Sequence, residues 1–420
     1  MVNDDSTRGS IQRVESSIAS IGNSDVVKRG VAALSSLRRR RVFNFPDHEV
    51  GRVYEYSALP SVSLSRDYYA GIPGGLLDRE SQPAVGEVVV ESSFVVFLFA
   101  NSARLSEVCA ETLAAADGLW IENYNESCFD LKFDCSSIEM LVLRGCSNLS
   151  NLYSLAEFSN LRHLCLMDCF KVRDLAPLSR LRDLEHLYFN DALRQMADIE
   201  PLSNLINLKS LHFHGCDNVS DLQPLSSLVS LDSLTLWGKS QVSDLGALSS
   251  LVNLHFLHLF DFDQVTDLRP LSALVDLESL SLSQCLGLAD LTPLAALVKL
   301  RSLKLSYCKQ VANLNPLRFI VNLKSLDLGG FELLADIKPI SCLENLDSLK
   351  LWGFNNVSDL SPLSRLVVLS SLTLCGCDSL ADLSPISRLH NLRRLELIAC
   401  SKTLSMDPLS GLENLKVTIK

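Results

Sequence analysis

The sequence predicts an α/β solenoid assembled from copies of one unit of 23 residues. The copy from Leu208 to Ser230 reads LKSLHFHGCDNVSDLQPLSSLVS, and the next copy opens 23 residues later at Leu231. A fixed period of this size indicates units that stack on their neighbours and share one continuous core. About twelve units fill residues 138–420, and the copies open at Ile138, Leu161, Leu184, Leu208, Leu231, Leu254, Leu277, Leu300, Leu323, Leu346, Leu369, Leu392 and Leu415.

The pattern L-x-x-L-x-L-x-x-C within each unit is typical of a leucine-rich repeat. We therefore expect a leucine-rich repeat arc with a parallel, concave β-sheet and short 3-10 or helical turns on the convex side. The short strand of the Leu208 unit directs Leu208, Leu211 and Phe213 into the core. We expect the other sides of this core to be lined by Val219, Leu222, Leu225 and Leu228.

The connection after each strand carries an aspartate followed by Leu-x-Pro-Leu. Such an aspartate can cap backbone N–H groups of a short helical turn, and proline suits a position that needs no donor. The aspartates could also be read as metal ligands, but the same local role in every unit favours capping. The aspartates are Asp174, Asp198, Asp221, Asp244, Asp267, Asp290, Asp336, Asp359 and Asp382, with Asn313 as the one amide. The prolines are Pro177, Pro201, Pro224, Pro270, Pro293, Pro316, Pro339, Pro362 and Pro385, with Ala247 as the exception.

Three regions are predicted along the chain. Residues 1–85 contain two helical patterns and then an irregular segment rich in proline and glycine. Residues 86–137 are expected to cap the array, with strand-like segments at 88–90 and 94–99, a helix at 102–117 and degenerate repeat strands. Residues 138–420 form the repeat domain, and the final strand lacks a recognisable C-terminal cap.

Composition limits the functional classes. A formal net charge of −11 argues against a nucleic-acid or anionic membrane surface, and no apolar run has the length of a membrane helix. The N-terminus lacks the layout of a secretory signal. Seven of the 13 cysteines share one repeat position, where we expect buried, reduced thiols, so a cytoplasmic location is predicted. They are Cys146, Cys169, Cys216, Cys285, Cys308, Cys377 and Cys400.

Strand alternation predicts which side chains lie on the concave face. In the C-terminal half they are mostly small, and Ser279, Ser302, Ser325, Ser348 and Ser371 form one line. Nearer the N-terminus, aromatic and histidine side chains are predicted on or beside exposed strand positions, and Trp352 with Lys350 forms a smaller contact. Exposed aromatic residues favour a protein or peptide partner. The candidate partner-binding residues are His163, His186, Tyr188, His212, His214, Trp237, His255, Phe256, His258, Phe260 and Trp352.

Three alternatives compete with a binding role for this patch. Like side chains on neighbouring strands could stack and bind nothing. The histidines could hold a metal in a hydrolase, but no standard ligand spacing is present. They could also act as a pH switch between about pH 7 and pH 6, because the unperturbed histidine pKa is about 6.5. No cofactor and no catalytic residue is predicted.

The block V-x-D-L-x-P-L-x-x-L, seen at Val219–Leu228 and Val357–Leu366, resembles the internalin and SDS22-like class of leucine-rich repeats. The L-x-L-x-x-C element is similar to the arrays of protozoan, notably trypanosomatid, leucine-rich repeat proteins. The resemblance covers about Ile138 to Lys420 and implies a concave face that grips a protein.

The sequence therefore predicts a non-enzymatic adaptor or scaffold with a protein or peptide in the concave groove. A second partner could bind the N-terminal region or the C-terminal edge strand. The alternatives are a regulatory subunit of a protein phosphatase, a substrate receptor of a ubiquitin ligase and, most remotely, a metal-dependent hydrolase.

Overall fold

The structure, a computed structural model, describes residues 88–91, 94–99, 118–128, 134–190, 195–239, 241–354, 356–377, 379–400 and 404–420. Two compact units divide the chain, with the boundary between Gly215 and Cys216. The predicted helices of residues 1–85 and 102–117 lie outside the described residues, as does the predicted degenerate strand at Leu131 and Phe133. The predicted domain boundaries stay predictions.

The described residues of the first unit contain seven strands in chain order. β1 and β2 pair antiparallel, since the two residues between them are too few for a parallel crossover. All later pairs of this unit are parallel. The strands are β1 (Val88–Glu91), β2 (Phe94–Phe99), β3 (Gly118–Glu122), β4 (Met140–Arg144), β5 (His163–Met167), β6 (His186–Asn190) and β7 (Ser210–His214). The 3-10 helices are η1 (Tyr153–Glu157), η2 (Ala176–Arg180) and η3 (Glu200–Asn204).

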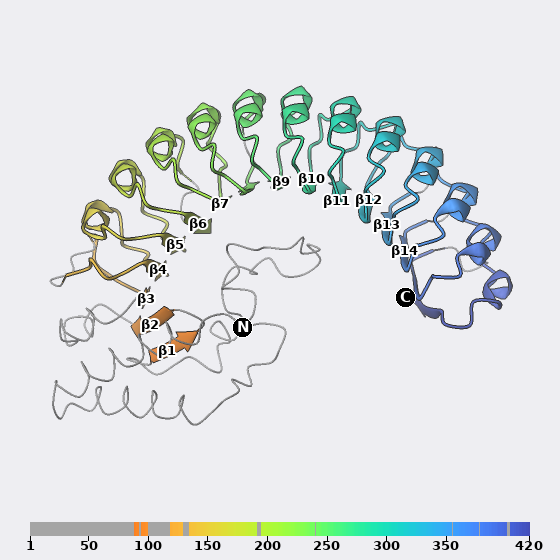
Figure 1. Cartoon of the computed structure of the whole chain (residues 1–420), viewed down its shortest axis with the longest axis horizontal. Helices are drawn as coiled ribbons and strands as arrows, with labels where there is room; N and C mark the ends of the chain where they lie inside the picture. The colour runs from red at the N-terminus through yellow and green to blue at the C-terminus, as the bar shows by residue number, and fades with distance from the viewer. Residues whose placement is uncertain are drawn as a thin grey trace. The chain divides into compact units, whose positions relative to one another are not determined.

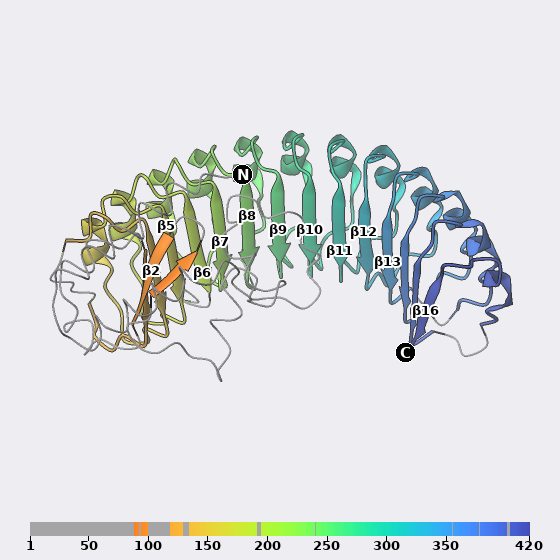
Figure 2. The same cartoon turned by 60° about the horizontal axis from the view of Figure 1, so that its bottom comes forward.

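The second unit contains only parallel pairs among its described strands, again in chain order. Figure 2 shows β8 to β13 side by side. The strands are β8 (Ser233–Trp237), β9 (Phe256–Phe260), β10 (Ser279–Ser283), β11 (Ser302–Ser306), β12 (Ser325–Gly329), β13 (Ser348–Trp352), β14 (Ser371–Cys375), β15 (Arg394–Ile398) and β16 (Lys416–Ile419). The 3-10 helices are η4 (Gln223–Ser227), η5 (Gly246–Ser250), η6 (Arg269–Ala273), η7 (Thr292–Ala296), η8 (Asn315–Phe319), η9 (Lys338–Cys342), η10 (Ser361–Arg365), η11 (Ser384–Arg388) and η12 (Asp407–Leu409).

The core of each unit lies between its strands and its 3-10 helices, which line opposite sides of the stack (Figure 1). Leu208, Leu211, Phe213 and the four predicted wall residues of the same repeat are at most 2% exposed. The predicted line of serines is confirmed, because Ser279 pairs with Ser302 and the register continues through Ser371. The residue period therefore sets the strand register.

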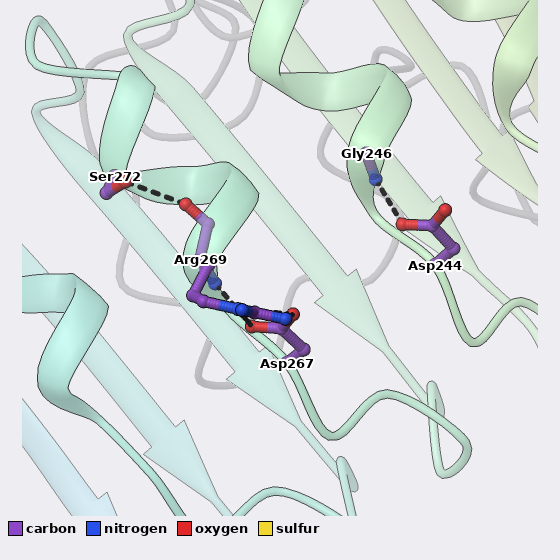
Figure 3. A network of polar contacts seen from close by, with 5 residues as sticks. All are labelled: Asp244, Gly246, Asp267, Arg269 and Ser272. Carbon is purple, nitrogen blue, oxygen red and sulfur yellow. Dashed lines mark hydrogen bonds and ion pairs between the residues drawn. The ribbon is translucent and has the colours of Figure 1, made fainter.

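The repeated aspartates cap the 3-10 turns, as predicted. Oδ1 of Asp244 accepts a 2.7 Å hydrogen bond from the backbone N–H of Gly246, and Asp267 does the same for Arg269 at 2.8 Å (Figure 3). Asn313 replaces the carboxylate with its amide oxygen at 2.9 Å from the backbone N of Asn315. A proline occupies one of the first two positions of most of these turns. The 3-10 helices from η2 to η11 are each five residues long.

A second ladder was not predicted from the sequence. An asparagine just before a repeat's first leucine donates its side-chain N–H to a backbone carbonyl of the preceding repeat. Asn253 reaches Val229 at 2.9 Å, and Asn322 reaches Val298 at 2.8 Å. The bond spans 24 residues of chain, so it ties neighbouring repeats together on the side of the turns.

The repeated cysteines lie in the core. Six of the seven are buried and Cys400 is half-buried, and all twelve described cysteines are reduced thiols. In six of the seven, Sγ contacts the backbone carbonyl two residues earlier, for example Cys169 to Met167 at 3.3 Å. They behave as small buried side chains, as the spacing indicated.

Candidate functional site

In the first unit, five of the candidate residues form two groups of ring contacts across β5, β6 and β7. His163 pairs with His186 in the sheet register, and their rings stack with centroids 4.6 Å apart and an interplanar angle of 8°. The ring of Tyr188 lies 5.9 Å from that of His212 and 5.8 Å from that of His214. The sheet therefore brings together residues that are about 23 residues apart in sequence.

The prediction that all these residues are exposed is wrong for two of them. His186 and Tyr188 are each only 5% exposed. Stacking explains this, because His163 covers His186 on one side and the two histidines of β7 lie against Tyr188. His163, His212 and His214 are half-buried. The aromatic and histidine side chains of β5, β6 and β7 thus offer less accessible surface than the sequence suggests.

Burial also changes the acid–base behaviour of the stacked histidines. Desolvation lowers the pKa of both His163 and His186 to about 4, and the neighbouring His163 lowers that of His186 further. Glu185 works in the opposite direction on both rings but does not offset the burial. Both rings therefore stay neutral at pH 7 and at pH 6, so the switch hypothesised for that range does not apply to this pair.

In the second unit, aromatic side chains meet on β8 and β9. Trp237 and Phe260 pair in register, and their rings form an edge-to-face contact with centroids 4.7 Å apart. Phe256 and His258 lie on the same face of β9 as Phe260, and all are half-buried. The leucines between them are at most 1% exposed on the core side. This group keeps apolar surface in contact with solvent.

His255 precedes β9 and has a different role. Its Nδ1 lies 2.8 Å from Oδ1 of Asp232 in the previous repeat, and its ring lies 6.5 Å from that of Phe256. Ion pairs join other neighbouring repeats, such as Lys299 with Asp276 at 2.5 Å. We therefore assign His255 to the contacts between repeats rather than to the accessible face.

Trp352 stands in a polar and aromatic group farther along the second unit. Its indole N–H donates a 2.9 Å hydrogen bond to Asp327 on β12, and its ring meets that of Tyr307 edge to face at 4.7 Å. Lys350 Nζ lies 3.8 Å from the other oxygen of Asp327. Space for the indole comes from Gly329, where an added Cβ would lie 2.1 Å from the ring.

Sequence reasoning missed Tyr307, Asp327 and Lys304 in this region. Alternation along β11 and β12 would have found the last two, because they pair in register in the middle of the strands. Tyr307 follows β11 with a positive φ of 55°, a conformation that alternation does not describe.

An exposed row of valines on the turn side was also missed. It lies two residues before the leucine that opens the next repeat, and each side chain is about half exposed. Exposed apolar side chains that recur at one repeat position can contact other molecules. The row in the second unit consists of Val229, Val252, Val275, Val298 and Val321.

The described residues contain neither a candidate metal cluster nor a candidate membrane helix. No three His, Cys, Asp or Glu side chains of the described ranges gather as ligands of a metal ion would. The described part of the chain also has no helix with the length and apolar content needed to cross a bilayer.

Comparison with solved structures decides the fold. No protein-family model and no curated protein matches the sequence. An internalin, InlF from Listeria monocytogenes, superposes with a TM-score of 0.56 and 25% identity over 75% of this chain and 92% of that one. The chain has a leucine-rich repeat fold. The internalin resemblance is thereby supported, whereas these structures give no support to the trypanosomatid one.

Two further leucine-rich repeat structures are similar at lower identity. The functional domain of InlJ from Listeria monocytogenes, described as including a cysteine ladder, gives a TM-score of 0.52 and 19% identity over 69% of this chain and 60% of that one. A leucine-rich repeat protein of Leptospira interrogans gives a TM-score of 0.49 and 18% identity over 74% of this chain and 92% of that one. Leucine-rich repeat folds of this class generally act as protein-interaction modules.

Proposed function

We propose that this leucine-rich repeat protein is a non-enzymatic adaptor or scaffold. It binds a protein partner through the face of its sheet that lies opposite the leucine core. The observation that carries the proposal is the group of Trp237, Phe256 and Phe260. These half-buried aromatic side chains share one face of β8 and β9, opposite the leucine core. Aromatic residues supply large contact areas and dominate many interfaces.

The second unit supports the proposal better than the first. Tyr188 and His186 of the first unit are already covered by their neighbours, so truncating them would disturb packing before it changed a binding surface. The aromatic side chains of β8 and β9 retain accessible area that a partner could cover. Burial of apolar area contributes about 25 cal/mol per Å² removed from water.

A reducing compartment such as the cytoplasm is part of the proposal. It is supported by the reduced thiols of all twelve described cysteines, most of them in the core. The phosphatase-regulator and ubiquitin-ligase alternatives differ from a generic scaffold only in the partner, so identification of the partner separates them.

Affinity capture from source-cell lysate tests the proposal. The wild type is compared with Trp237→Ala/Phe256→Ala/Phe260→Ala and with a control, Val275→Ser/Val298→Ser, which changes the exposed valine row. We expect a stoichiometric partner with the wild type and the valine variant but not with the aromatic variant. Equal recovery with all three chains would refute a binding role for this face, and circular dichroism verifies that each variant folds.

A further inference from the structure

Tyr307 and Trp352 form an aromatic corner on the second unit. Their ring centroids are 4.7 Å apart at an interplanar angle of 69°, so two nearly perpendicular ring faces bound the space between them. Tyr307 is 48% exposed, and Trp352 is half-buried. Trp352 occupies the same register position as Phe260, so the corner lies on the face proposed for partner binding. Accessible aromatic surface of this kind favours an apolar occupant.

The backbone is arranged to hold these two rings. The indole of Trp352 lies against Gly329, where an added Cβ would come within 2.1 Å of the ring. The ring of Tyr307 lies against Gly330, where an added Cβ would come within 2.8 Å. Tyr307 itself follows β11 with a φ of 55°. The equivalent residues after other strands of the second unit are Asp261, Gln284, Gly330, Gly353, Gly376 and Ala399. A bulky aromatic residue is costly in this left-handed conformation, so its presence points to a role for the side chain.

The charged groups beside the corner balance one another. From β11 to β15 the middle strand positions pair in register as a row of Lys304, Asp327, Lys350, Thr373 and Glu396. Two lysines are thus matched by two carboxylates, and Lys350 Nζ lies 3.8 Å from Asp327. This part of the face has no net charge, so an occupant of the corner needs no charge of its own.

The polar groups at the corner offer a donor and leave no carboxylate oxygen free. Oδ1 of Asp327 accepts the indole N–H of Trp352 at 2.9 Å, and Oδ2 lies near Lys350. Within the described part of the chain, the hydroxyl of Tyr307 has no hydrogen-bond partner, so it can donate to a carbonyl. A polyproline II segment is complementary, because its carbonyl groups make no internal hydrogen bonds and proline has no N–H donor.

We propose that the aromatic corner binds a proline ring in a polyproline II segment of a partner polypeptide. The pyrrolidine ring packs between the faces of Tyr307 and Trp352, and the Tyr307 hydroxyl donates to a backbone carbonyl of the segment. A proline ring is apolar, uncharged and rigid, so it suits the balanced charges and loses little conformational freedom on binding. The proposal rests on the proposed function, because it specifies the chemistry of a partner at the same face.

Selection of random linear peptides displayed on phage against the full-length chain provides the probe, and we expect enrichment of proline-rich peptides. For a selected peptide, Tyr307→Ala should weaken binding about tenfold or more, because it removes one side of the corner. Ala399 shows that alanine accepts the left-handed conformation after a strand. Tyr307→Phe should weaken binding about fivefold, because it removes only the hydroxyl. Tyr153→Ala, at a tyrosine that is 58% exposed outside the corner, is the matched control.

Two further changes separate the possible outcomes. Gly329→Ala should also weaken binding, because the new Cβ displaces the indole while both aromatic residues remain. Replacing the selected proline by alanine should weaken binding to the wild type as much as Tyr307→Ala does, with little further loss in the combination. If peptides lose affinity with Trp237→Ala/Phe260→Ala but not with Tyr307→Ala, the corner is wrong and the proposed function stands. Enrichment of Lys or Arg in place of proline would make the occupant a cation. If no peptide is enriched, the prolyl segment is refuted, and affinity capture alone decides the proposed function.

Discussion

The indole N–H of Trp352 donates a hydrogen bond to Oδ1 of Asp327 over 2.9 Å, from one strand of the sheet to the next. The bond holds the ring over Gly329 and against the edge of Tyr307. It also engages the carboxylate that lies between Lys304 and Lys350 in the sheet register. The orientation of one aromatic side chain and the charge of the face are therefore set together.

Removing the acceptor should release the indole. We expect Asp327→Ala to cost about 1 kcal/mol of stability and to shift the emission of Trp352, which becomes mobile. The difference spectrum against the same variant carrying Trp352→Phe isolates this residue among the three tryptophans. Gly329→Ala should produce a similar shift, because the new Cβ would meet the ring at 2.1 Å. Gly411→Ala serves as the control, because a Cβ added at Gly411 would meet no neighbouring atom within 4 Å. Unchanged emission in both variants would contradict the described contact.

If the aspartates act as caps, replacing Asp244 by Ala and by Asn should change the stability by different amounts. Asp244→Ala should lower the free energy of unfolding by about 1 kcal/mol, since the backbone N–H of Gly246 loses its acceptor. Asp244→Asn should have a much smaller effect, because Asn313 makes the same contact with an amide oxygen elsewhere in the chain. Urea denaturation measures both. A loss of equal size with Asn would show that the charge, rather than the acceptor, matters.

The stacked histidines predict how stability depends on pH. The pKa of His186 is about 6.5 in the unfolded chain and about 4 in the folded one, so the unfolded state binds more protons in between. Stability should be level above about pH 6.5 and fall as the pH decreases toward 4, by about 3 kcal/mol for this residue. His186→Phe should reduce the slope, whereas His390→Gln, at an exposed position, should not. A slope between pH 8 and pH 7 that disappears in His186→Phe would contradict the assignment.

Thiol reactivity should follow burial. Desolvation raises the pKa of Cys216 and of Cys377 to about 12, and thiolate is the reactive form. Cys128 is exposed and Cys342 is half-buried. Under native conditions we expect iodoacetamide to modify Cys128 first and the two buried thiols only after unfolding. Mass spectrometry of peptides from a time course checks the order, and early alkylation of Cys216 would show that the core opens readily.

The sequence predicted those features that repeat and missed those that depend on one neighbour. Leu208, Phe213 and the Asp221 cap occur in every unit in some form, so period and chemistry together determine their place. The burial of Tyr188 depends instead on two particular histidines of the next strand. The position of Trp352 depends on Gly329 being a glycine one strand away. Pairings of this kind are specific to one pair of repeats, and a consensus pattern does not contain them.

The candidate site was predicted in outline for the same reason. Alternation correctly assigned Phe256, His258 and Phe260 to one face of a strand, because it requires only that the core side be known. It could not show that His186 is covered by its stacked neighbour.

The most direct test of the account is the affinity of the captured partner for three forms of the full chain, measured by isothermal titration calorimetry. The account predicts that Trp237→Ala/Phe256→Ala/Phe260→Ala weakens binding at least about a hundredfold, because anchor residues at an interface contribute about 2 kcal/mol or more. It predicts that Val275→Ser/Val298→Ser leaves the affinity unchanged. Loss of affinity in the valine variant, with the aromatic variant binding as the wild type does, would place the partner on the turn side and contradict the central claim.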